Sequence, residues 1–364
     1  MRDCCRSTVR HMSEKVLVAM SGGVDSSMTA ALLQEAGCEL LGVTMRLYCG
    51  EGDAAVCGSA KDAEDAAHIA QMMGFPHAVL DYTAAFEKEV IDRFAAGYAA
   101  GETPNPCILC NRCMKFSRLW DYAKENGCDA MATGHYARVE RAENGRWLLK
   151  RPRDLSKDQT YVLYHLTQEQ LAHLRLPLGA LTKAEVRADA ERRQLPTASK
   201  PDSQDICFVP DGDYAAFLER RGTTVGAGNF IDTDGHICGK HRGHIHYTVG
   251  QRKGLGIAMG HPVYVVAKDA AANTVTLGDK TQLPTPALFA DDLNFISVEH
   301  PRTPLRCTAR TRYHQPETAA TVIPEENGVR VVFDESKVAA PGQAIVFYDG
   351  DTVLGGGTIR RLLR

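Results

Sequence analysis

Cysteines at short spacing are the residues of this sequence with the most specific chemistry. The segment TPNPCILCNRCMKF (103–116) carries Cys107 and Cys110, and SQDICFVP (203–210) carries Cys207. A Pro-Asn-Pro turn predicts the start of a helix, on which residues three apart lie on neighbouring sides of one turn. A thiol near a helix N-terminus has a lowered pKa and is a better nucleophile at neutral pH. The pattern therefore predicts sulfur chemistry, with Cys207 on an apolar, strand-like run.

Zinc binding is another use of clustered cysteines. Structural zinc sites usually draw on a second closely spaced pair. The sequence offers none, because Cys207, Cys238 and Cys307 are each isolated. Cys113 is interpreted as a residue on the face of the helix. A disulfide framework is typical of small secreted chains, and a chain of 364 residues with 12 cysteines does not need one.

A glycine-rich turn predicts a phosphate-binding loop. In VAMSGGVDSS (18–27) an apolar strand runs into Ser21, Gly22 and Gly23, and a helix follows at once. Glycines let backbone N–H groups approach an anion, and the helix N-terminus adds partial positive charge. No Gly-Lys-Ser/Thr follows, which excludes a Walker A loop. We therefore expect a pyrophosphate site, with Asp25 near magnesium on the phosphates.

The elements that must position these residues fall into two halves. Up to about residue 205, strands alternate with helices, which is typical of a parallel sheet covered on both faces. We expect strands at 16–20, 40–47, 78–80 and 129–133, and helices at 27–36 and at 61–73 with Ser59 as N-cap and Gly74 after its end. Beyond residue 205, we expect a helix at 214–221 and strands at 244–249, 263–267, 274–277, 307–312, 329–333 and 344–348.

These patterns predict an α/β fold in which an open parallel-sheet domain of Rossmann type precedes two small β-rich domains. The second half is expected to form one or two antiparallel barrels. An Asn-Gly pair within 141–153 predicts a hairpin tip. The expected limits are an N-terminal extension at 1–14, the α/β domain at 15–205, a central β domain at 206–280 and a C-terminal barrel-like domain at 281–364.

Composition excludes several classes of protein. The chain has 44% hydrophobic and 24% charged residues, which is typical of a globular protein, and no apolar run approaches the ~18 residues of a membrane span. Its start lacks the apolar core of a signal peptide, so we expect a cytoplasmic protein without a membrane partner. With a net charge of −3, any RNA site must rest on local basic patches, which occur at 141–153, 241–254 and 301–313. His244 and His246 alternate within the second patch, but no third ligand type completes a metal set.

Several motifs together resemble one known family. SGGVDSS resembles the PP-loop of ATP pyrophosphatases, which activate an oxygen as an adenylate. The whole chain from Lys15 resembles the tRNA-specific 2-thiouridylases, the MnmA/TrmU family, through the loop, TPNP-x-x-x-C-N, ICF, TGHYAR (133–138), KDQTYVLY (157–164), HRGHIHYTVGQRKGLG (241–256) and TRYHQ (311–315). The resemblance implies a tRNA-uridine 2-sulfurtransferase that uses ATP and Mg²⁺. It also implies tRNAs for Lys, Glu and Gln as substrates, a cysteine desulfurase or sulfur relay as donor, and a monomer.

The resemblance further implies a role for each matching residue. Cys207 would carry a persulfide, and Cys110 would release its sulfur and close a transient Cys110–Cys207 disulfide. The ATP site would comprise Ala19, Met20, Ser21, Gly22, Gly23, Val24, Asp25, Ser26, Met45 and Gly134. The flipped wobble uridine would lie beside Asn105, Pro106 and Cys107, and the tRNA would be contacted by Lys157, Asp158, Gln159, Arg312 and Tyr313.

One departure from the family keeps an alternative open. The family often has aspartate where this chain has Cys107, and the thiols of Cys107, Cys110 and Cys207 would suit a [4Fe–4S] cluster with one open iron. Two further alternatives are a PP-loop ligase for small molecules, which leaves the cysteines and the β-rich half unexplained, and a non-catalytic RNA-binding protein with a structural zinc site.

Overall fold

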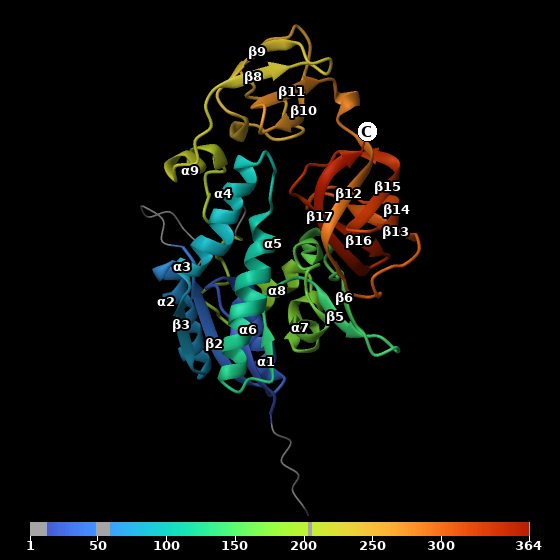
Figure 1. Cartoon of the computed structure of the whole chain (residues 1–364). Helices are drawn as coiled ribbons and strands as arrows, with labels where there is room; N and C mark the ends of the chain where they lie inside the picture. Colours follow the sequence, from blue (N-terminus) through green and yellow to red (C-terminus); the bar gives the residue numbers. More distant parts are fainter. Residues whose placement is uncertain (1–12, 49–58, 203–205, 364) are drawn as a thin grey trace, which may run out of the picture.

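Three sheets organise the residues that the computed structural model describes, which are 13–48, 59–202 and 206–363. A parallel sheet with helices on its faces forms the N-terminal part, a small four-stranded sheet forms the central part, and a larger sheet that closes on itself forms the C-terminal part (Figure 1). The predicted fold, an α/β domain followed by two β-rich domains, is confirmed. The N-terminal extension lies almost wholly outside the described residues, and so does the predicted boundary at 205.

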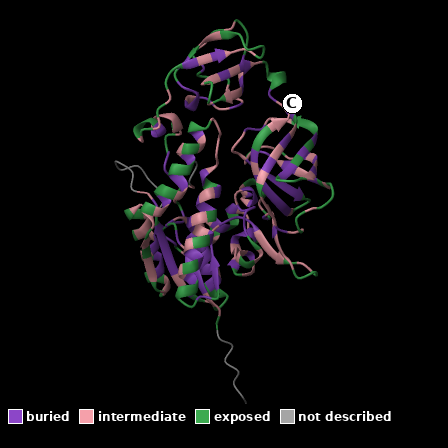
Figure 2. Cartoon of the chain, viewed as in Figure 1, coloured by how far each residue is buried: buried purple, intermediate pink, exposed green. Residues whose placement is uncertain are grey.

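Apolar runs that alternate with helices produce the parallel sheet. Its strands in spatial order are β3 (His77–Asp81), β2 (Glu39–Arg46), β1 (Lys15–Ala19), β4 (Ala130–Ala132) and β7 (Leu174–Arg175). Residues 16–18 of the central strand are fully buried, as expected of a strand covered on both faces (Figure 2). Because the strands are parallel, the loops after their carboxyl ends meet at one edge, where α/β proteins place their ligands.

The helices around this sheet begin and end at residues with local signals. They are α1 (Val24–Glu35), α2 (Ala60–Met73), α3 (Thr83–Phe86), α4 (Asp92–Ala99), α5 (Pro106–Cys110), α6 (Leu119–Glu125), α7 (Gln168–Ala172) and α8 (Lys183–Arg192). The hydroxyl of Ser59 accepts the N–H of Asp62 at 3.1 Å, and Gly74 ends α2 with a φ of 77°. Both predicted caps of α2 are confirmed.

The C-terminal sheet closes through one strand that pairs on both sides. β12 (Thr285–Phe295) pairs with β15 (Gly328–Lys337) and with β17 (Thr352–Leu363), and the circuit between them is completed by β14 (Thr318–Glu325), β13 (Leu305–Arg310) and β16 (Ala344–Asp349). The predicted Asn-Gly hairpin is present as β5 (Arg138–Arg141) and β6 (Trp147–Lys150). Lys150 pairs with Thr352 of β17, so a hairpin from the first half of the chain extends the C-terminal sheet.

The central sheet differs from its prediction in two ways. Its order is β10 (Tyr264–Asp269), β11 (Thr274–Gly278), β8 (Gly228–Ile231) and β9 (Ile237–His241), preceded by α9 (Tyr214–Arg220). The sheet is not wholly antiparallel, because β11 and β8 run parallel. The predicted strand at 244–249 is wrong, since His244–His246 form a 3₁₀ turn after Gly243, whose φ is 125°.

Contacts made by the two histidines explain this turn. A nitrogen of His244 lies 3.1 Å from the carbonyl of Ala99 at the end of α4, and His246 lies 3.0 Å from Glu219 on α9. An extended segment places alternate side chains on one face. A turn instead lets the two rings reach different helices. His244 therefore joins the central part to α4, whereas His246 binds α9 within the central part, and the pair is no two-histidine metal face.

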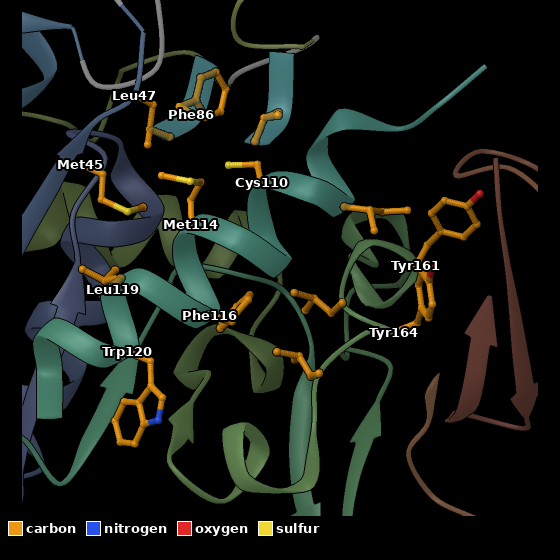
Figure 3. Close-up of a cluster of buried hydrophobic side chains, with 14 of the residues drawn as sticks. Met45, Leu47, Phe86, Cys110, Met114, Phe116, Leu119, Trp120, Tyr161 and Tyr164 are labelled. Atoms are coloured by element: carbon orange, nitrogen blue, oxygen red, sulfur yellow. The ribbon is translucent and has the colours of Figure 1, made fainter. Parts of the chain in front are cut away.

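The largest hydrophobic cluster joins the α/β part to the barrel. Figure 3 shows Phe86, Cys110 and Met114 gathered on one side, with Tyr161 and Tyr164 extending toward the barrel strands. The hydroxyl of Tyr161 donates to the carbonyl of Ala344 on β16 at 2.8 Å. The two parts consequently share this cluster, although each also has a cluster of its own. None of the described helices is long and apolar enough to cross a membrane.

Acid sensitivity is the first testable consequence. His165 is 7% exposed beside Phe116, and neither ring nitrogen has a hydrogen-bond partner among the described residues. Burial, aided by the charge of Arg112, lowers the pKa of His165 to about 3. Because this pKa lies below the unfolded value of about 6.5, neutral His165 stabilises the fold above pH 6.5, and that stability is lost as the pH falls through 6.5 toward 3. Between pH 7.5 and 5.5 the wild type should lose about 1 kcal/mol more unfolding free energy than His165→Leu.

Urea denaturation of both proteins at each pH measures this difference. The other titrating groups, including buried His135, are present in both proteins and cancel in the comparison. A difference that does not change with pH would show that His165 remains protonatable in the folded protein.

Candidate active site

The turn between β1 and α1 is packed so closely that only glycine fits. Gly22 has a φ of 69°, and a Cβ atom there would lie 2.3 Å from the carbonyl oxygen of Asp62 at the start of α2. The hydroxyl of Ser26 accepts the N–H of Ser21 at 3.2 Å and donates to the carbonyl of Gly23 at 3.0 Å. These bonds hold the turn open at the helix N-terminus, which is the geometry that binds phosphate.

A second glycine brings another segment onto the same turn. A Cβ atom at Gly134, in the loop after β4, would lie 3.0 Å from atoms of Asp25. The structure therefore brings together Gly22, Asp25 and Gly134, which the sequence assigned to one ATP site. Among the other predicted ATP-site residues, Met20 and Met45 are buried at the ends of β1 and β2. The carboxyl edge of the sheet thus carries the predicted nucleotide residues.

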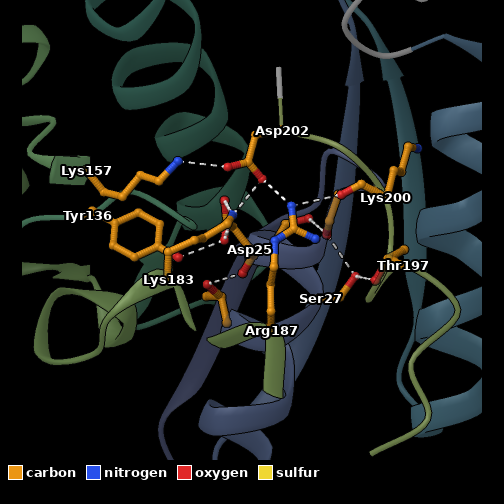
Figure 4. A network of polar contacts seen from close by, with 12 residues as sticks. Asp25, Ser27, Tyr136, Lys157, Lys183, Arg187, Thr197, Lys200 and Asp202 are labelled. Carbon is orange, nitrogen blue, oxygen red and sulfur yellow. Dashed lines mark hydrogen bonds and ion pairs between the residues drawn. The ribbon is translucent and has the colours of Figure 1, made fainter. Parts of the chain in front are cut away.

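Lys183, which is distant in the sequence, lies beside the loop. The Nζ atom of Lys183 lies 2.7 and 2.8 Å from the two carboxylate oxygens of Asp25, and the hydroxyl of Tyr136 donates to the same carboxylate at 2.9 Å (Figure 4). Lys183 is 9% exposed. Burial and the neighbouring Asp25 raise the pKa of Tyr136, so its hydroxyl remains a hydrogen-bond donor. The loop lacks a lysine in its own sequence, yet it has a buried one beside it.

Sequence reasoning missed Lys183, although one signal pointed to its position. Thr182 and Glu185 form a capping box, in which the Thr182 hydroxyl accepts the Glu185 N–H at 3.3 Å and a Glu185 carboxylate oxygen accepts the Thr182 N–H at 2.7 Å. The Thr-x-x-Glu pattern could have located the start of α8 and put Lys183 at its first position. It could not have shown that this helix end faces the loop.

Asp202 forms ion pairs with three cationic side chains beside the loop. Its carboxylate lies 2.9 Å from Lys157, 2.8 Å from Lys183 and 2.7 Å from Arg187 (Figure 4). Burial opposes ionisation of Asp202, but hydrogen bonds from Lys183 and Lys157 outweigh it and lower its pKa to about 2. Asp202 is therefore ionised throughout the physiological range and fixes the three cations in place.

The segment just before Asp202 is tied to the loop itself. Lys200 donates to the carbonyl of Gly22 at 3.0 Å and pairs with Asp62 at 2.7 Å and Asp65 at 2.8 Å. The hydroxyl of Thr197 donates to that of Ser27 in α1 at 3.0 Å. This segment leads along the chain to Cys207, so the same stretch that carries the second cysteine is anchored at the nucleotide loop.

The first cysteine segment begins a helix as predicted. The side chain of Asn105 accepts the N–H of Cys107 at 3.0 Å, and Pro106 occupies the first position of α5. Cys107 is exposed, Cys110 is 8% exposed, and a π-helical turn (Asn111–Arg118) continues the helix. Cys113 lies on the π-helical turn and packs against the hydrophobic cluster, and burial raises its pKa.

Cys207 lies in a turn and not on the predicted strand-like run. The N–H of Val209 donates to the carbonyl of Ile206 at 3.0 Å, which closes the turn. Phe208 explains this conformation, because its ring is fully enclosed by aromatic neighbours with centroids 5.2 to 6.3 Å away, namely Tyr48, Phe86, Phe94 and Phe217. Cys110 belongs to the same hydrophobic cluster, and Cys207 packs against it.

Both β-rich parts hold the segment that precedes Cys107. The N–H of Thr103 donates to the carbonyl of Pro341 at 2.8 Å, and the amide of Gln343 donates to the carbonyl of Thr103 at 2.6 Å. His244 of the central part reaches Ala99, as described above. The cysteine helix therefore begins at the place where all three parts of the molecule meet.

The predicted tRNA-contacting residues make contacts within the protein. Arg312 donates to the carbonyl of Val249 in the central part at 2.8 Å, and burial lowers the pKa of Arg312. Tyr313 packs on Tyr161 with ring centroids 6.1 Å apart. The buried carboxylate of Asp158 lies between arginines. These residues surround the junction of the domains.

A parallel sheet with a glycine turn after its first strand, joined to two β modules, is the architecture of an α/β nucleotide-binding class of protein with appended β domains. The family models that match describe the same order. They are a "tRNA methyl transferase HUP domain" over residues 14–211, a "tRNA methyl transferase PRC-barrel domain" over 215–279 and an "Aminomethyltransferase beta-barrel domain" over 285–359.

Full-length relatives identify the family. The chain is 49% identical over 356 residues to the tRNA-specific 2-thiouridylase MnmA of Acetivibrio thermocellus, covering 95% of this chain and 99% of that protein. It is 51% identical over 352 residues to that of Moorella thermoacetica, covering 94% and 98%, and 47% identical over 354 residues to that of Halothermothrix orenii, covering 95% and 99%. The chain belongs to the tRNA-specific 2-thiouridylase family. The predicted family, and with it the predicted class of sulfurtransferase enzyme, is confirmed.

The close packing of Gly22 gives a second prediction. Gly22→Ala should lower the free energy of unfolding by about 1–3 kcal/mol more than Gly37→Ala, because a Cβ at Gly22 meets the Asp62 carbonyl. Gly37 is a matched control, since its φ is 83° and a Cβ there would meet nothing within 4 Å. The control should show only the cost of a left-handed alanine, about 1 kcal/mol. Urea denaturation measures both changes, and equal losses would contradict the close approach.

Proposed function

We propose that this chain replaces the C2 oxygen of the wobble uridine in tRNA with sulfur, at the expense of ATP. The observation that carries the proposal is the common location of the two kinds of chemistry. Residues after the carboxyl end of β1 form the nucleotide loop. Residues after the carboxyl end of the neighbouring strand β2 belong to the hydrophobic cluster that contains Cys110 and contacts Cys207. A small-molecule ligase or a non-catalytic RNA-binding protein would not need two thiols in a cluster beside the nucleotide loop.

Adenylation is the first step of the proposed reaction. The C2 oxygen of the uridine attacks the α-phosphorus of ATP, and pyrophosphate leaves. Lys183 stands beside the loop to neutralise charge that develops on the phosphates. The carboxylate of Asp25 offers the oxygen ligands that Mg²⁺ prefers, and an ion held there would further neutralise the phosphates. Since Asp25 is held by Lys183 and Tyr136, it is positioned before the nucleotide arrives.

Sulfur transfer is the second step. Cys207 carries a persulfide, and the thiolate of Cys110 attacks its inner sulfur, so that a Cys110–Cys207 disulfide forms and hydrosulfide leaves. The hydrosulfide attacks C2 of the uridine, and AMP leaves with the former C2 oxygen. A thiol reductant returns both cysteines to thiols.

The partners follow from this chemistry. The persulfide sulfur comes from a cysteine desulfurase or a sulfur-relay protein, and the substrates are tRNAs for Lys, Glu and Gln. Asn105, Pro106 and Cys107 form the predicted surroundings of the flipped base, and the exposure of Cys107 leaves that end of α5 accessible. We further propose that the enzyme works as a monomer in the cytoplasm.

Nucleoside mass spectrometry on an unmodified tRNA transcript tests the proposal. Iron-free protein is incubated with ATP, Mg²⁺, a cysteine desulfurase and cysteine. The wild type and Cys113→Ser should produce 2-thiouridine at the wobble position, whereas Cys110→Ser and Cys207→Ser should lose at least about a hundredfold in product, because each removes a nucleophile. Cys113 lies on the same helix region and serves as the matched control.

Iron distinguishes the persulfide route from the cluster route. If the iron-free wild type is inactive and anaerobic reconstitution with iron restores 2-thiouridine, then Cys107, Cys110 and Cys207 act as ligands of a [4Fe–4S] cluster. Cys107 and Cys110 lie on α5, and Cys207 packs against the cluster that contains Cys110, so the donor set suits that group. Absence of product under both conditions would contradict the proposed reaction itself.

A further inference from the structure

Three consecutive residues, 157–159, each bind a different part of the molecule. Lys157 pairs with Asp202 at 2.9 Å, beside the nucleotide loop. Asp158 faces Arg310 of the barrel at 3.3 Å. The side chain of Gln159 accepts the N–H of Tyr136 at 2.7 Å, and Tyr136 itself holds Asp25. We call this turn the 157–159 joint.

Asp158 is too enclosed to serve as a contact for RNA. Its side chain is 5% exposed. One carboxylate oxygen accepts the N–H of Thr160 at 2.9 Å and its hydroxyl at 2.6 Å, while the other faces Arg310 at 3.3 Å and Arg151 at 3.8 Å. Both oxygens therefore face protein donors, and a carboxylate would in any case repel phosphate.

The arginines that face Asp158 bridge two parts of the chain. Arg151 follows β6 and Arg310 ends β13, and both guanidinium groups lie over the ring of Tyr348, with centroid distances of 4.4 and 5.3 Å. Glu317 of the barrel completes the cluster, since it accepts from Arg151 and from Arg310, the latter at 3.1 Å. Two cations and two anions thus balance in a largely buried space, where a charge left without a partner is strongly unfavourable.

Neighbouring contacts show that this cluster fixes one domain against another. The hydroxyl of Thr160 lies 3.3 Å from that of Tyr348, and Tyr161 donates to Ala344 on β16. The turn after Asp158 is therefore bonded to the barrel along its length. Its other side reaches the nucleotide loop through Lys157 and Gln159.

We propose that Asp158 is a positioning residue, which sets the barrel relative to the nucleotide site and influences tRNA through that arrangement without touching it. Lys157 and Gln159 link the same turn to Asp202 and Tyr136, beside the nucleotide loop. Because the barrel also holds the segment before Cys107, a displaced barrel would misplace the base-binding end of α5. The effect on catalysis rests on the proposed function, but the effect on the free protein does not.

Hydrogen exchange of the RNA-free full chain, read by mass spectrometry, is the decisive experiment. Asp158→Asn keeps the shape of the side chain and removes its charge. It should raise exchange at least about fivefold in 158–164 and in the facing strands β13 and β16. Arg306→Gln is the matched control, because Arg306 also lies on β13 and pairs with Asp334, but both side chains are about half exposed. The control should leave these regions unchanged.

A double variant tests whether Asp158 and Arg310 act as a pair. The exchange changes in Asp158→Asn/Arg310→Gln should be smaller than the sum of the two single changes, because the second substitution removes the charge that the first leaves unpaired. Additive changes would overturn the pairing. If circular dichroism shows that Asp158→Asn does not fold, Arg310→Lys is measured instead, since it keeps the charge but loses the planar fork.

Steady-state kinetics separates positioning from direct contact. In Asp158→Asn the KM for tRNA should rise about tenfold, while the affinity for ATP, measured by equilibrium dialysis, should stay within about twofold of the wild type. Weakened tRNA binding with unchanged hydrogen exchange in the free protein would mean that Asp158 contacts RNA, and would overturn the proposal. An inactive wild type would contradict the proposed function, whereas the exchange result would still decide the role of Asp158.

Discussion

The close approach of backbone segments around the turn after β1 is the constraint on which the rest of the site depends. Gly22 lets the start of α2 come within contact of the turn, and Gly134 lets the loop after β4 reach Asp25. Side chains at either position would push these segments apart. With them in place, the first N–H groups of α1 lie at the open end of the turn, where an anion is favoured, and Tyr136 comes within reach of Asp25. The hydrophobic sheet beneath the turn keeps the site rigid, and the two glycines allow the close backbone contacts.

Charge balance is the second feature that the tight packing creates. Four acidic and four basic side chains crowd this edge, namely Asp25, Asp62, Asp65, Asp202, Lys157, Lys183, Arg187 and Lys200. Each of these cations has an acidic partner, so none is left uncompensated in a partly buried place. A polyphosphate brings several negative charges, and it can share these cations only if the acids also gain partners. Under the proposed function, magnesium at Asp25 would supply one.

The sequence predicted features that depend on local interactions. SGGVDSS sufficed for the nucleotide turn, and Ser59 and Gly74 marked the ends of α2, because a glycine φ or a cap bond involves residues only a few positions apart. Lys183 and Asp202 were missed, since they meet Asp25 only after the sheet has formed. The turn at Cys207 was mistaken for a strand because its apolar residues pack into an aromatic cluster from distant segments. The segment 244–249 was mistaken for a strand because His244 and His246 bind helices that lie far away in the sequence. The assigned roles of Cys110, Cys207 and the ATP-site residues came from family resemblance and remain predictions.

Both β-rich parts contribute to the active site without supplying its expected catalytic groups. The segment before Cys107 has few apolar residues of its own to bury, and its backbone is held by Pro341 and Gln343 from the barrel. Lys268 of the central part lies over the ring of Tyr98 at 5.7 Å, and burial lowers its pKa to about 8. Lys268 is buried only while the central part stays packed against α4, because separation of the two parts would expose the lysine to water. The two β-rich parts thus fix the start of the cysteine helix from outside, so a change in their packing would displace the segment that carries Cys107 and Cys110.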